Sequence, residues 1–426
     1  MRSKAIPLMV CVTALFWSQT SFSGTTGKIA GVVKDASTGE PIPGVNVFLE
    51  GTTTGAAADI DGKYFIINVP PGTYTVLASV IGYTSVRQTN VAVSVDLTTA
   101  LDFSLSPTVL ELGTEVVITA ERPLVKKDLT SVESRVTAAQ IQSMPVQDFG
   151  DVLNLQSGVT VDRFGNIHIR GGRTSEIAYW VDGVSVTDVY DNSASVIIEN
   201  NFVQELQVIS GTFNAEYGNA MSGIINVVTK EGGRRYEGNF STYAGDYSSS
   251  DDQLFYNIEN FRPTANRNFQ ASLGGPVPGF GDTFTFYATA RYFHTDGWLY
   301  GQRRFTTSGY FGDNAAVSLN WRTKWSGQAK LTYRFSPTFK LSINGLGSTE
   351  DYHDYNHDYR YNPDGDVNKF NDGYNLNLSL THTLSARTFY DVDVSRSYKV
   401  FNEYLYEDPL DQRYMHPDFL NRGAYN

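Results

Sequence analysis

The residues that could perform catalysis are scattered along the chain and form no recognised pattern. The sequence has no HExxH motif and no evident Ser/His/Asp set, and its one cysteine is Cys11. His353 and His357 are four residues apart, a spacing that can hold zinc on a helix. Their context, DYHDYNHDY, favours a solvated binding or linker loop instead. We therefore expect no catalytic residue, no metal site and no cofactor.

Two further motifs approach the pattern of a ligand-binding loop without completing it. Arg170-Gly171-Gly172-Arg173 lacks the glycine spacing and the final Lys-Ser/Thr of a phosphate-binding P-loop. Asp59 and Asp61 precede Gly62, but the acidic ligands that a calcium loop needs after this glycine are missing. We interpret both motifs as turns.

Another motif could bind a protein partner. Val116-Val117-Ile118-Thr119 is strongly β-prone and lies between Gly113 and Pro123, which break regular structure. Such a segment can be an ordinary strand. It can also add to the exposed sheet edge of a partner, where main-chain hydrogen bonds supply the affinity. The residues alone leave both possibilities open.

Composition and the N-terminus limit the class of protein. A formal charge of −12 over 426 residues argues against nucleic acid as a partner. A basic start, an apolar core over 6–17 and Ser21-Phe22-Ser23 predict a signal peptide, residues 1–23, cleaved before Gly24. After it no apolar run is long enough for a transmembrane helix. This does not exclude membrane-spanning β-strands, which produce no hydropathy peak.

Residues 24–106 are expected to form a small β-sandwich. Alternating segments at 29–33, 45–49, 64–69 and 74–80 are separated by Gly- and Pro-rich turns, a spacing typical of short antiparallel strands. The run from GVVKDASTGE to VLASVIGY resembles the carboxypeptidase-regulatory-like domain, an immunoglobulin-like sandwich that precedes many bacterial outer-membrane receptors. The resemblance implies no peptidase activity.

Residues 130–232 are expected to form a compact α/β-like domain. Thr137 and Gln140 have the spacing of a capping box that opens a short helix, and 148–155 predicts a second helix. Asp182-Gly183 predicts a hairpin-like turn between two short strands. Strands are also expected at 202–209 and 223–229.

Two blocks of this domain, NIHIRGGRTSEIAYWVDGVSVTD and NNFVQELQVISGTFNAEYGNAMSGIINVVTKEGG, resemble the plug domain of TonB-dependent outer-membrane receptors. The matching residues are Arg170, Gly171, Gly172, Asp182, Gly183, Glu205, Glu216, Tyr217, Gly218, Gly223 and Asn226. The preceding linker, 107–129, resembles the TonB box at Thr114, Glu115, Val116, Val117, Ile118, Thr119 and Ala120. For a plug, Arg170 and Glu216 would suit charge-assisted bonds to a barrel wall. Outside that family, Arg170, Glu205 and Glu216 would be ordinary surface charges.

Residues 233–426 are rich in aromatic residues and alternate between apolar and polar positions. We expect about seven strands, centred near residues 240, 271, 287, 330, 343, 379 and 393. Their length should be about ten residues, with a short turn at 335–339 and a long loop over 348–372. A soluble sandwich would bury the apolar face, whereas a membrane barrel would expose it. The resemblance favours part of an outer-membrane β-barrel, cut short because a plugged barrel has about 22 strands.

The expected fold is therefore mainly β: an Ig-like sandwich, an α/β plug and the first strands of an incomplete transmembrane antiparallel barrel. The resemblance implies an outer-membrane receptor for TonB-energised uptake of an extracellular solute. The solute could be an iron chelate, an oligosaccharide, a cobalamin or a peptide. The implied partners are a periplasmic TonB-type transducer and outer-membrane lipid. The alternative is a secreted or surface adhesion protein whose β domains bind glycan.

Overall fold

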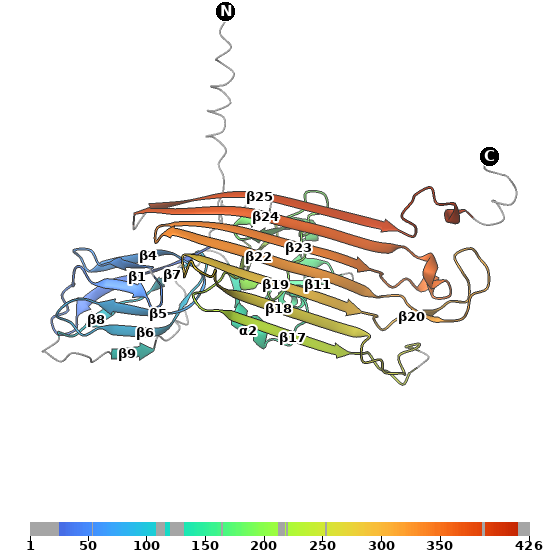
Figure 1. The fold of residues 1–426 in the computed structure, drawn as a ribbon, viewed down its shortest axis with the longest axis horizontal. Coiled ribbons are helices and arrows are strands. Elements are labelled where there is room, and N and C mark those ends of the chain that lie inside the picture. Colours follow the sequence, from blue (N-terminus) through green and yellow to red (C-terminus); the bar gives the residue numbers. More distant parts are fainter. Residues whose placement is uncertain are drawn as a thin grey trace, which may run out of the picture.

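The computed structural model describes residues 25–52, 54–107, 116–119, 132–162, 165–211, 218, 220–251, 254–385 and 388–415. These residues form three β-rich regions along the chain (Figure 1). An N-terminal sandwich lies at one end of a long antiparallel sheet, and a middle domain packs behind that sheet. No helix among the described residues is long and apolar enough to cross a membrane.

The N-terminal sandwich has two sheets, as the turn spacing predicted. One sheet has the order β4-β1-β7, with β8 also paired to β1, and the other has the order β3-β2-β5-β6-β9. Its strands are β1 (Gly27–Asp35), β2 (Asn46–Leu49), β3 (Gly55–Ala57), β4 (Lys63–Val69), β5 (Gly72–Ser79), β6 (Val86–Val93), β7 (Thr98–Ala100), β8 (Phe103–Leu105) and β9 (Val116–Thr119). Apolar side chains fill the space between the sheets, among them the buried Ile29, Tyr64 and Phe103.

The Asp59 turn is closed by the protein's own backbone. The Asp59 carboxylate accepts hydrogen bonds from the N–H groups of Asp61, at 3.0 Å, and Lys63, at 2.8 Å. An Asp side chain that binds the backbone two residues on is a common turn device. The geometry agrees with the interpretation of this motif as a turn.

The middle domain is a five-stranded sheet with the order β10-β15-β16-β13-β14, together with a β11-β12 hairpin and two short helices. The elements are β10 (Val132–Thr137), α2 (Ala138–Ser143), α3 (Phe149–Asn154), β11 (Val159–Val161), β12 (Ile167–Ile169), η1 (Thr174–Glu176), β13 (Ile177–Val181), β14 (Val184–Ser185), β15 (Val203–Ser210) and β16 (Gly223–Thr229). The predicted capping box is present, because the Thr137 N–H donates to Gln140 Oε1 at 2.9 Å. Both helices pack on a core that includes Leu153, Phe202 and Leu206.

The third region, called here the wall sheet, has seven strands in the order β17-β18-β19-β22-β23-β24-β25. They are β17 (Glu237–Gly245), β18 (Asn266–Pro276), β19 (Phe284–Thr295), β22 (Arg322–Ser336), β23 (Phe339–Tyr352), β24 (Asn368–Ser385) and β25 (Thr388–Tyr404). Every predicted strand centre falls in one of them. The strands reach 18 residues, however, so the expected length of about ten was too short.

Short and long connections alternate along the wall sheet. The turns at 277–283 and 337–338 lie at the sandwich end, where Asn68 donates to the hydroxyl of Thr383 at 2.6 Å. Longer connections at 246–265, 296–321 and 353–367 lie at the opposite end. The second of these contains β20 (Tyr300–Gln302) and β21 (Ala316–Ser318), seen at the far right of Figure 1.

The long loop predicted over 348–372 is shorter and less solvated than expected. Strand β23 continues to Tyr352 and β24 begins at Asn368. Main-chain pairing between these strands extends as far as Tyr352 and Lys369, beyond the segment in which apolar and polar residues alternate. His353 is only 5% exposed, and its Nδ1 lies 2.7 Å from the carbonyl oxygen of Leu319. The prediction of a solvated loop was therefore wrong for His353. His357 lies in a separate 3₁₀ turn, η2 (His357–Tyr359), so the two histidines share no helix.

The wall sheet buries its polar face against the middle domain and exposes its apolar face. In β19, Thr285, Thr289 and Arg291 are at most 6% exposed. In the neighbouring strands, apolar residues that alternate with such polar positions are largely exposed: Leu331 (41%), Ile343 (49%), Leu376 (52%), Leu378 (41%), Val392 (47%) and Val394 (63%). This is the reverse of the burial in a soluble β-sandwich.

Candidate functional site

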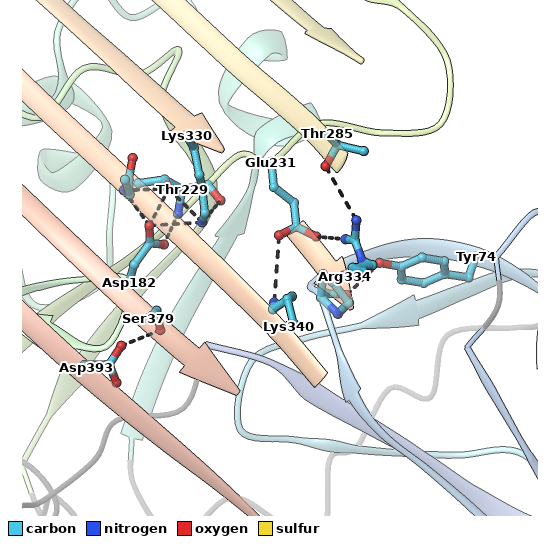
Figure 2. A network of polar contacts seen from close by, with 12 residues as sticks. Tyr74, Asp182, Thr229, Glu231, Thr285, Lys330, Arg334, Lys340, Ser379 and Asp393 are labelled. Atoms are coloured by element: carbon cyan, nitrogen blue, oxygen red, sulfur yellow. Dashed lines mark hydrogen bonds and ion pairs between the residues drawn. The ribbon is translucent and has the colours of Figure 1, made fainter. Parts of the chain in front are cut away.

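The predicted Asp182-Gly183 turn forms the first of several polar contacts between the middle domain and the wall sheet. Both residues have positive φ, +47° and +81°, as a two-residue hairpin between β13 and β14 requires. The buried Asp182 carboxylate accepts from the Thr229 N–H at 2.8 Å. It also accepts from Lys330 Nζ at 3.0 Å (Figure 2). A further hydrogen bond comes from Asn344 Nδ2 at 2.6 Å. Asp182 therefore joins β16 of the middle domain to β22 and β23 of the wall.

A second contact lies just after β16, at Glu231. Its carboxylate accepts from Arg334 at 2.8 Å and lies 3.9 Å from Lys340 Nζ (Figure 2). Burial alone would raise the pKa of Glu231, but the positive charges of Lys340 and Arg334 outweigh it and lower the pKa to about 2. Glu231 is therefore ionised at neutral pH, which favours both contacts.

A third and more buried contact centres on Glu199, which is 1% exposed. Its carboxylate pairs with Arg291 of β19 and lies 2.9 Å from Lys324 Nζ of β22. Ser326 donates to the same carboxylate at 3.0 Å. Asp148, the N-cap of α3, lies 3.0 Å from Arg291 and 3.2 Å from Lys324. Two acids of the middle domain thus face two bases of the wall.

The charges at this interface are segregated by sign. In each ion pair found between the described residues of the middle domain and the wall sheet, the acid belongs to the middle domain and the base to the wall. The pairs are Asp148 and Glu199 with Arg291 and Lys324, Asp182 with Lys330, Asp191 with Lys399, and Glu231 with Arg334 and Lys340. The described residues of the middle domain are thus held by electrostatic contacts and by hydrogen bonds, and Leu346 is the wall residue that belongs to their apolar core.

The glycine motif at 170–172 shapes the middle domain. Arg170 and Gly171 have φ of +50° and +74°, and a Cβ on Gly172 would lie 2.3 Å from the Cβ of Ser222. A Cβ on Gly223 would similarly meet Ile169 at 2.4 Å, so this strand start also needs glycine.

The side chain of Arg170 reaches Gly211, the last described residue before the block that holds Glu216 in the sequence. Its Nη1 lies 3.0 Å from the position of a Cβ on Gly211. Glu216 and Tyr217 lie outside the described part of the chain. Gly218 is described, and it is exposed. The charge-assisted bonds expected of Arg170 and Glu216 therefore stay a prediction.

Glu205 is not a surface charge, because it is 1% exposed and joins the middle domain to the N-terminal sandwich. Its Oε1 accepts from the backbone N–H of Val95 at 3.1 Å and lies 2.9 Å from Arg135 Nη1. Arg135 also donates to the carbonyl of Val95 at 2.6 Å. Asn226 is fully buried nearby, with its amide 3.0 Å from that of Gln207.

The central four residues of the predicted TonB box, Val116 to Thr119, form strand β9. This strand pairs in parallel with β6 at the edge of the sandwich, with Val86 opposite Val116 and Thr89 opposite Thr119. Thr114, Glu115 and Ala120 lie outside the described residues. In this structure the segment is a strand of the protein's own sheet.

Several residues of the interface were not selected from the sequence as site residues. Lys330, Arg334 and Arg291 stand at polar positions of alternating strands, so the pattern places them on the polar face of the sheet without identifying their partners. Glu199 lies in an irregular segment before β15, where neither periodicity nor a motif marks it.

Two family models match the chain. The CarboxypepD_reg-like domain matches residues 29–118, and the TonB-dependent Receptor Plug Domain matches residues 125–224. The first match covers the sandwich and extends into β9. The second covers most of the middle domain and includes Arg170, Asp182 and Glu205.

The chain is also similar to curated relatives and to solved structures. The TonB-dependent transporter Oar of Myxococcus xanthus is 26% identical over 315 residues, which are 66% of this chain and 29% of Oar. The TonB-dependent receptor SusC of Bacteroides thetaiotaomicron is 24% identical over 367 residues, 79% of this chain and 35% of SusC. The siderophore receptor PirA of Pseudomonas aeruginosa superimposes with a TM-score of 0.43 at 19% identity, covering 65% of this chain and 43% of PirA.

The chain spans about a third of the length of these two curated relatives. The relatives are receptors and transporters, and the matching carboxypeptidase-related model describes a regulatory-like domain. The resemblance drawn from the sequence motifs is confirmed. Residues 29–118 thus match a CarboxypepD_reg-like domain, residues 125–224 match the plug domain of TonB-dependent receptors, and the curated relatives of the chain include TonB-dependent receptors and transporters.

Proposed function

We propose that this protein acts in the bacterial outer membrane in the TonB-energised uptake of an extracellular solute. In this proposal the wall sheet is part of a transmembrane barrel and the middle domain is the plug in its lumen. The observation that carries the proposal is the inverted burial of the wall sheet. A barrel wall must be apolar toward lipid and polar toward its lumen.

Contact between the apolar face of the wall sheet and water costs free energy, whereas contact between this face and hydrocarbon does not. Side chains such as Ile343, Leu376 and Val394 are about half exposed or more, and they are neighbours on adjacent strands. Contiguous apolar surface of this kind usually marks a protein or membrane contact. The five inner strands of the wall sheet, from β18 to β24 in its order, are paired on both sides, as hydrocarbon requires.

Aromatic side chains gather near both ends of the apolar face. Close to the short turns, Phe335 lies 4.6 Å from Tyr333 and 5.0 Å from Phe339, measured between ring centroids. Toward the long loops, Tyr292 lies 4.6 Å from Trp325. Two aromatic girdles that flank an apolar band are typical of the membrane–water interfaces of outer-membrane barrels.

The basic wall and the acidic plug suit a domain that must stay in place yet rearrange. Ion pairs such as Lys330–Asp182 can be exchanged for water without exposing a large apolar surface. In the proposed cycle a solute binds the long loops and the plug, and a periplasmic TonB-type transducer then pulls residues 114–120. No catalytic step is involved. The signal peptide is cleaved after residue 23 during export, and the solute class stays open among iron chelates, oligosaccharides, cobalamins and peptides.

The rival function is adhesion by a soluble protein, and the apolar face separates the two. In a soluble protein Ile343 would contact water, whereas in a membrane wall it contacts lipid. The experiment is spin labelling of single-cysteine variants of the exported chain, since Cys11 lies in the signal peptide. A label at Ile343→Cys should be accessible to oxygen but shielded from a water-soluble nickel chelate.

The matched control is Tyr310→Cys, in the loop between β20 and β21, where the side chain is 64% exposed. Its label should be accessible to the nickel chelate. Equal accessibility of the two labels, in material that fractionates with soluble proteins, would overturn the membrane assignment and favour adhesion.

A further inference from the structure

We propose that the open edge of β6 is a strand-binding site whose ligand is the segment Val116 to Thr119. The sandwich would hold this segment until it is taken up by the transducer. The inference rests on the proposed function only in naming the competing partner; the strand-binding site itself rests on the geometry of the sandwich.

The main-chain pairing of β6 and β9 defines the site. Val86, Arg87, Gln88 and Thr89 lie opposite Val116, Val117, Ile118 and Thr119 in parallel register. Strand β9 is the last of its sheet, after β3, β2, β5 and β6, so within the described part of the chain β6 is the one strand to which it is bonded. Strand addition of this kind obtains affinity from backbone hydrogen bonds and tolerates many side chains.

The site is suited to release. Strand β9 has four residues, and a parallel pair is slightly less stable per residue than an antiparallel one. The other strands of the sandwich belong to two sheets that pack against each other around an apolar core, which includes Ile29, Tyr64 and Phe103. Loss of four residue pairs at an edge leaves the pairing among β3, β2, β5 and β6 in place.

The strand that holds the segment is also the strand that is fastened to the plug. Strand β6 ends at Val93, and two residues later the N–H of Val95 donates to Glu205 while its carbonyl accepts from Arg135. Glu205 and Arg135 belong to the neighbouring plug strands β15 and β10. The position of the box segment is therefore fixed relative to the plug through one strand of the sandwich.

A consequence follows for the periplasmic partner. A transducer that recognises the segment by strand addition meets it already paired along one edge. If the binding-competent state is the released one, the apparent affinity is reduced by the fraction of chains in which the segment is free. The sandwich would then set how readily the receptor engages its transducer.

The test is a redox-controlled lock in the exported chain, which has no other cysteine. The variant Q88C/I118C places two thiols at directly opposed positions. Mild oxidation should crosslink them, because paired strands bring Cα atoms within the range that a disulfide can bridge. The control is Q88C/V116C, in which the second thiol lies opposite Val86, two residues away along the strand, and should not crosslink.

Binding of a purified TonB C-terminal domain is then measured in both redox states. We expect oxidised Q88C/I118C to bind at least roughly tenfold more weakly than the reduced form, with recovery on reduction. Equal affinity in the two states would overturn the proposed competition. Absence of the crosslink in a chain that keeps hydrogen-exchange protection of β1 and β4 would overturn the strand-binding site.

The same experiment separates this inference from the proposed function. If the crosslink forms but the TonB domain binds neither redox state nor the unsubstituted chain, TonB-energised uptake is rejected while the strand-binding site stands.

Discussion

The N-terminal sandwich and the wall sheet share an alternation of apolar and polar residues, yet they bury opposite faces. In the sandwich, Tyr64 and Phe103 are buried between two sheets and polar residues face outward. In the wall sheet, Arg291 and Lys330 are buried and Ile343 is exposed. The same period therefore produced two different structures.

The difference shows that alternation determines which residues share a face but not which face is buried. In the sandwich the apolar faces have each other to pack against. The polar face of the wall sheet is covered by the plug, whose acids match the wall's bases at Asp182 and Glu199. The neighbour supplied by the rest of the chain decides the outcome. Four predictions test this contrast.

The largest effect is expected at the centre of the buried ion pairs. Glu199→Gln removes the charge that faces Arg291 and Lys324, leaving Asp148 as their remaining carboxylate. Breaking a buried ion pair by removing one partner costs about 3–5 kcal/mol. Chemical unfolding in detergent, followed by hydrogen-exchange protection of the plug strands β15 and β16, should show the plug transition at a lower midpoint.

The control for Glu199 is Asp191→Asn, which removes the acid facing Lys399. The Asp191 side chain is 45% exposed, so its pair is solvated and should contribute less than about 1 kcal/mol. Similar unfolding midpoints for the two variants would mean that the plug does not bury the polar face of the wall sheet at Glu199.

The second effect concerns the sandwich alone. Phe103→Ala removes a ring that is 2% exposed and packs 6.1 Å from the ring of Tyr64. Truncation of a buried Phe costs about 3 kcal/mol or more. Proteolysis or hydrogen exchange should detect the loss in the sandwich strands while the plug keeps its protection. A uniform loss through all regions would show that the sandwich and plug unfold as one unit, joined through Val95.

The sequence could predict the features that depend on local patterns, but not those that depend on contacts with distant parts of the chain. All seven wall strands and the Asp182-Gly183 turn could be predicted, because period-two alternation and a two-residue turn are local signals. The strand lengths and the buried position of His353 could not, since they depend on loops packing at the far end of the wall. Glu199 carried no signal, because its role arises only when Arg291 and Lys324 are brought to it.

Low pH should weaken the contacts of the wall more than the apolar packing of the sandwich. The pKa of Glu231 is lowered from 4.5 to about 2, and that of Asp148 is lowered by Lys324 and Arg291 against the opposing effect of burial. A depressed carboxyl pKa stabilises the fold above the unfolded-state value and loses this contribution as pH falls through the folded-state value. Between pH 4.5 and 2 the plug should therefore lose on the order of 2 kcal/mol.

The measurement is the plug's unfolding midpoint at pH 5 and at pH 2.5, compared with Glu231→Gln. The variant should be destabilised at pH 5 and should show a smaller decrease on acidification. If the variant and the unsubstituted chain lose stability in parallel, Glu231 does not hold the plug to Arg334 and Lys340.

The smallest effect is expected on the exposed face of the wall. Ile343→Ala removes a side chain that is 49% exposed and that would contact detergent or lipid in the proposed membrane wall. Its loss should cost less than about 1 kcal/mol, because apolar surroundings replace the missing contacts. Leu346, three residues along the same strand, is 2% exposed and belongs to the core of the plug domain. Leu346→Ala should therefore cost about 2–4 kcal/mol in the same unfolding experiment, as cavity formation requires. A reversed ranking of the two variants would mean that the wall sheet buries its apolar face, as the sheets of the sandwich do.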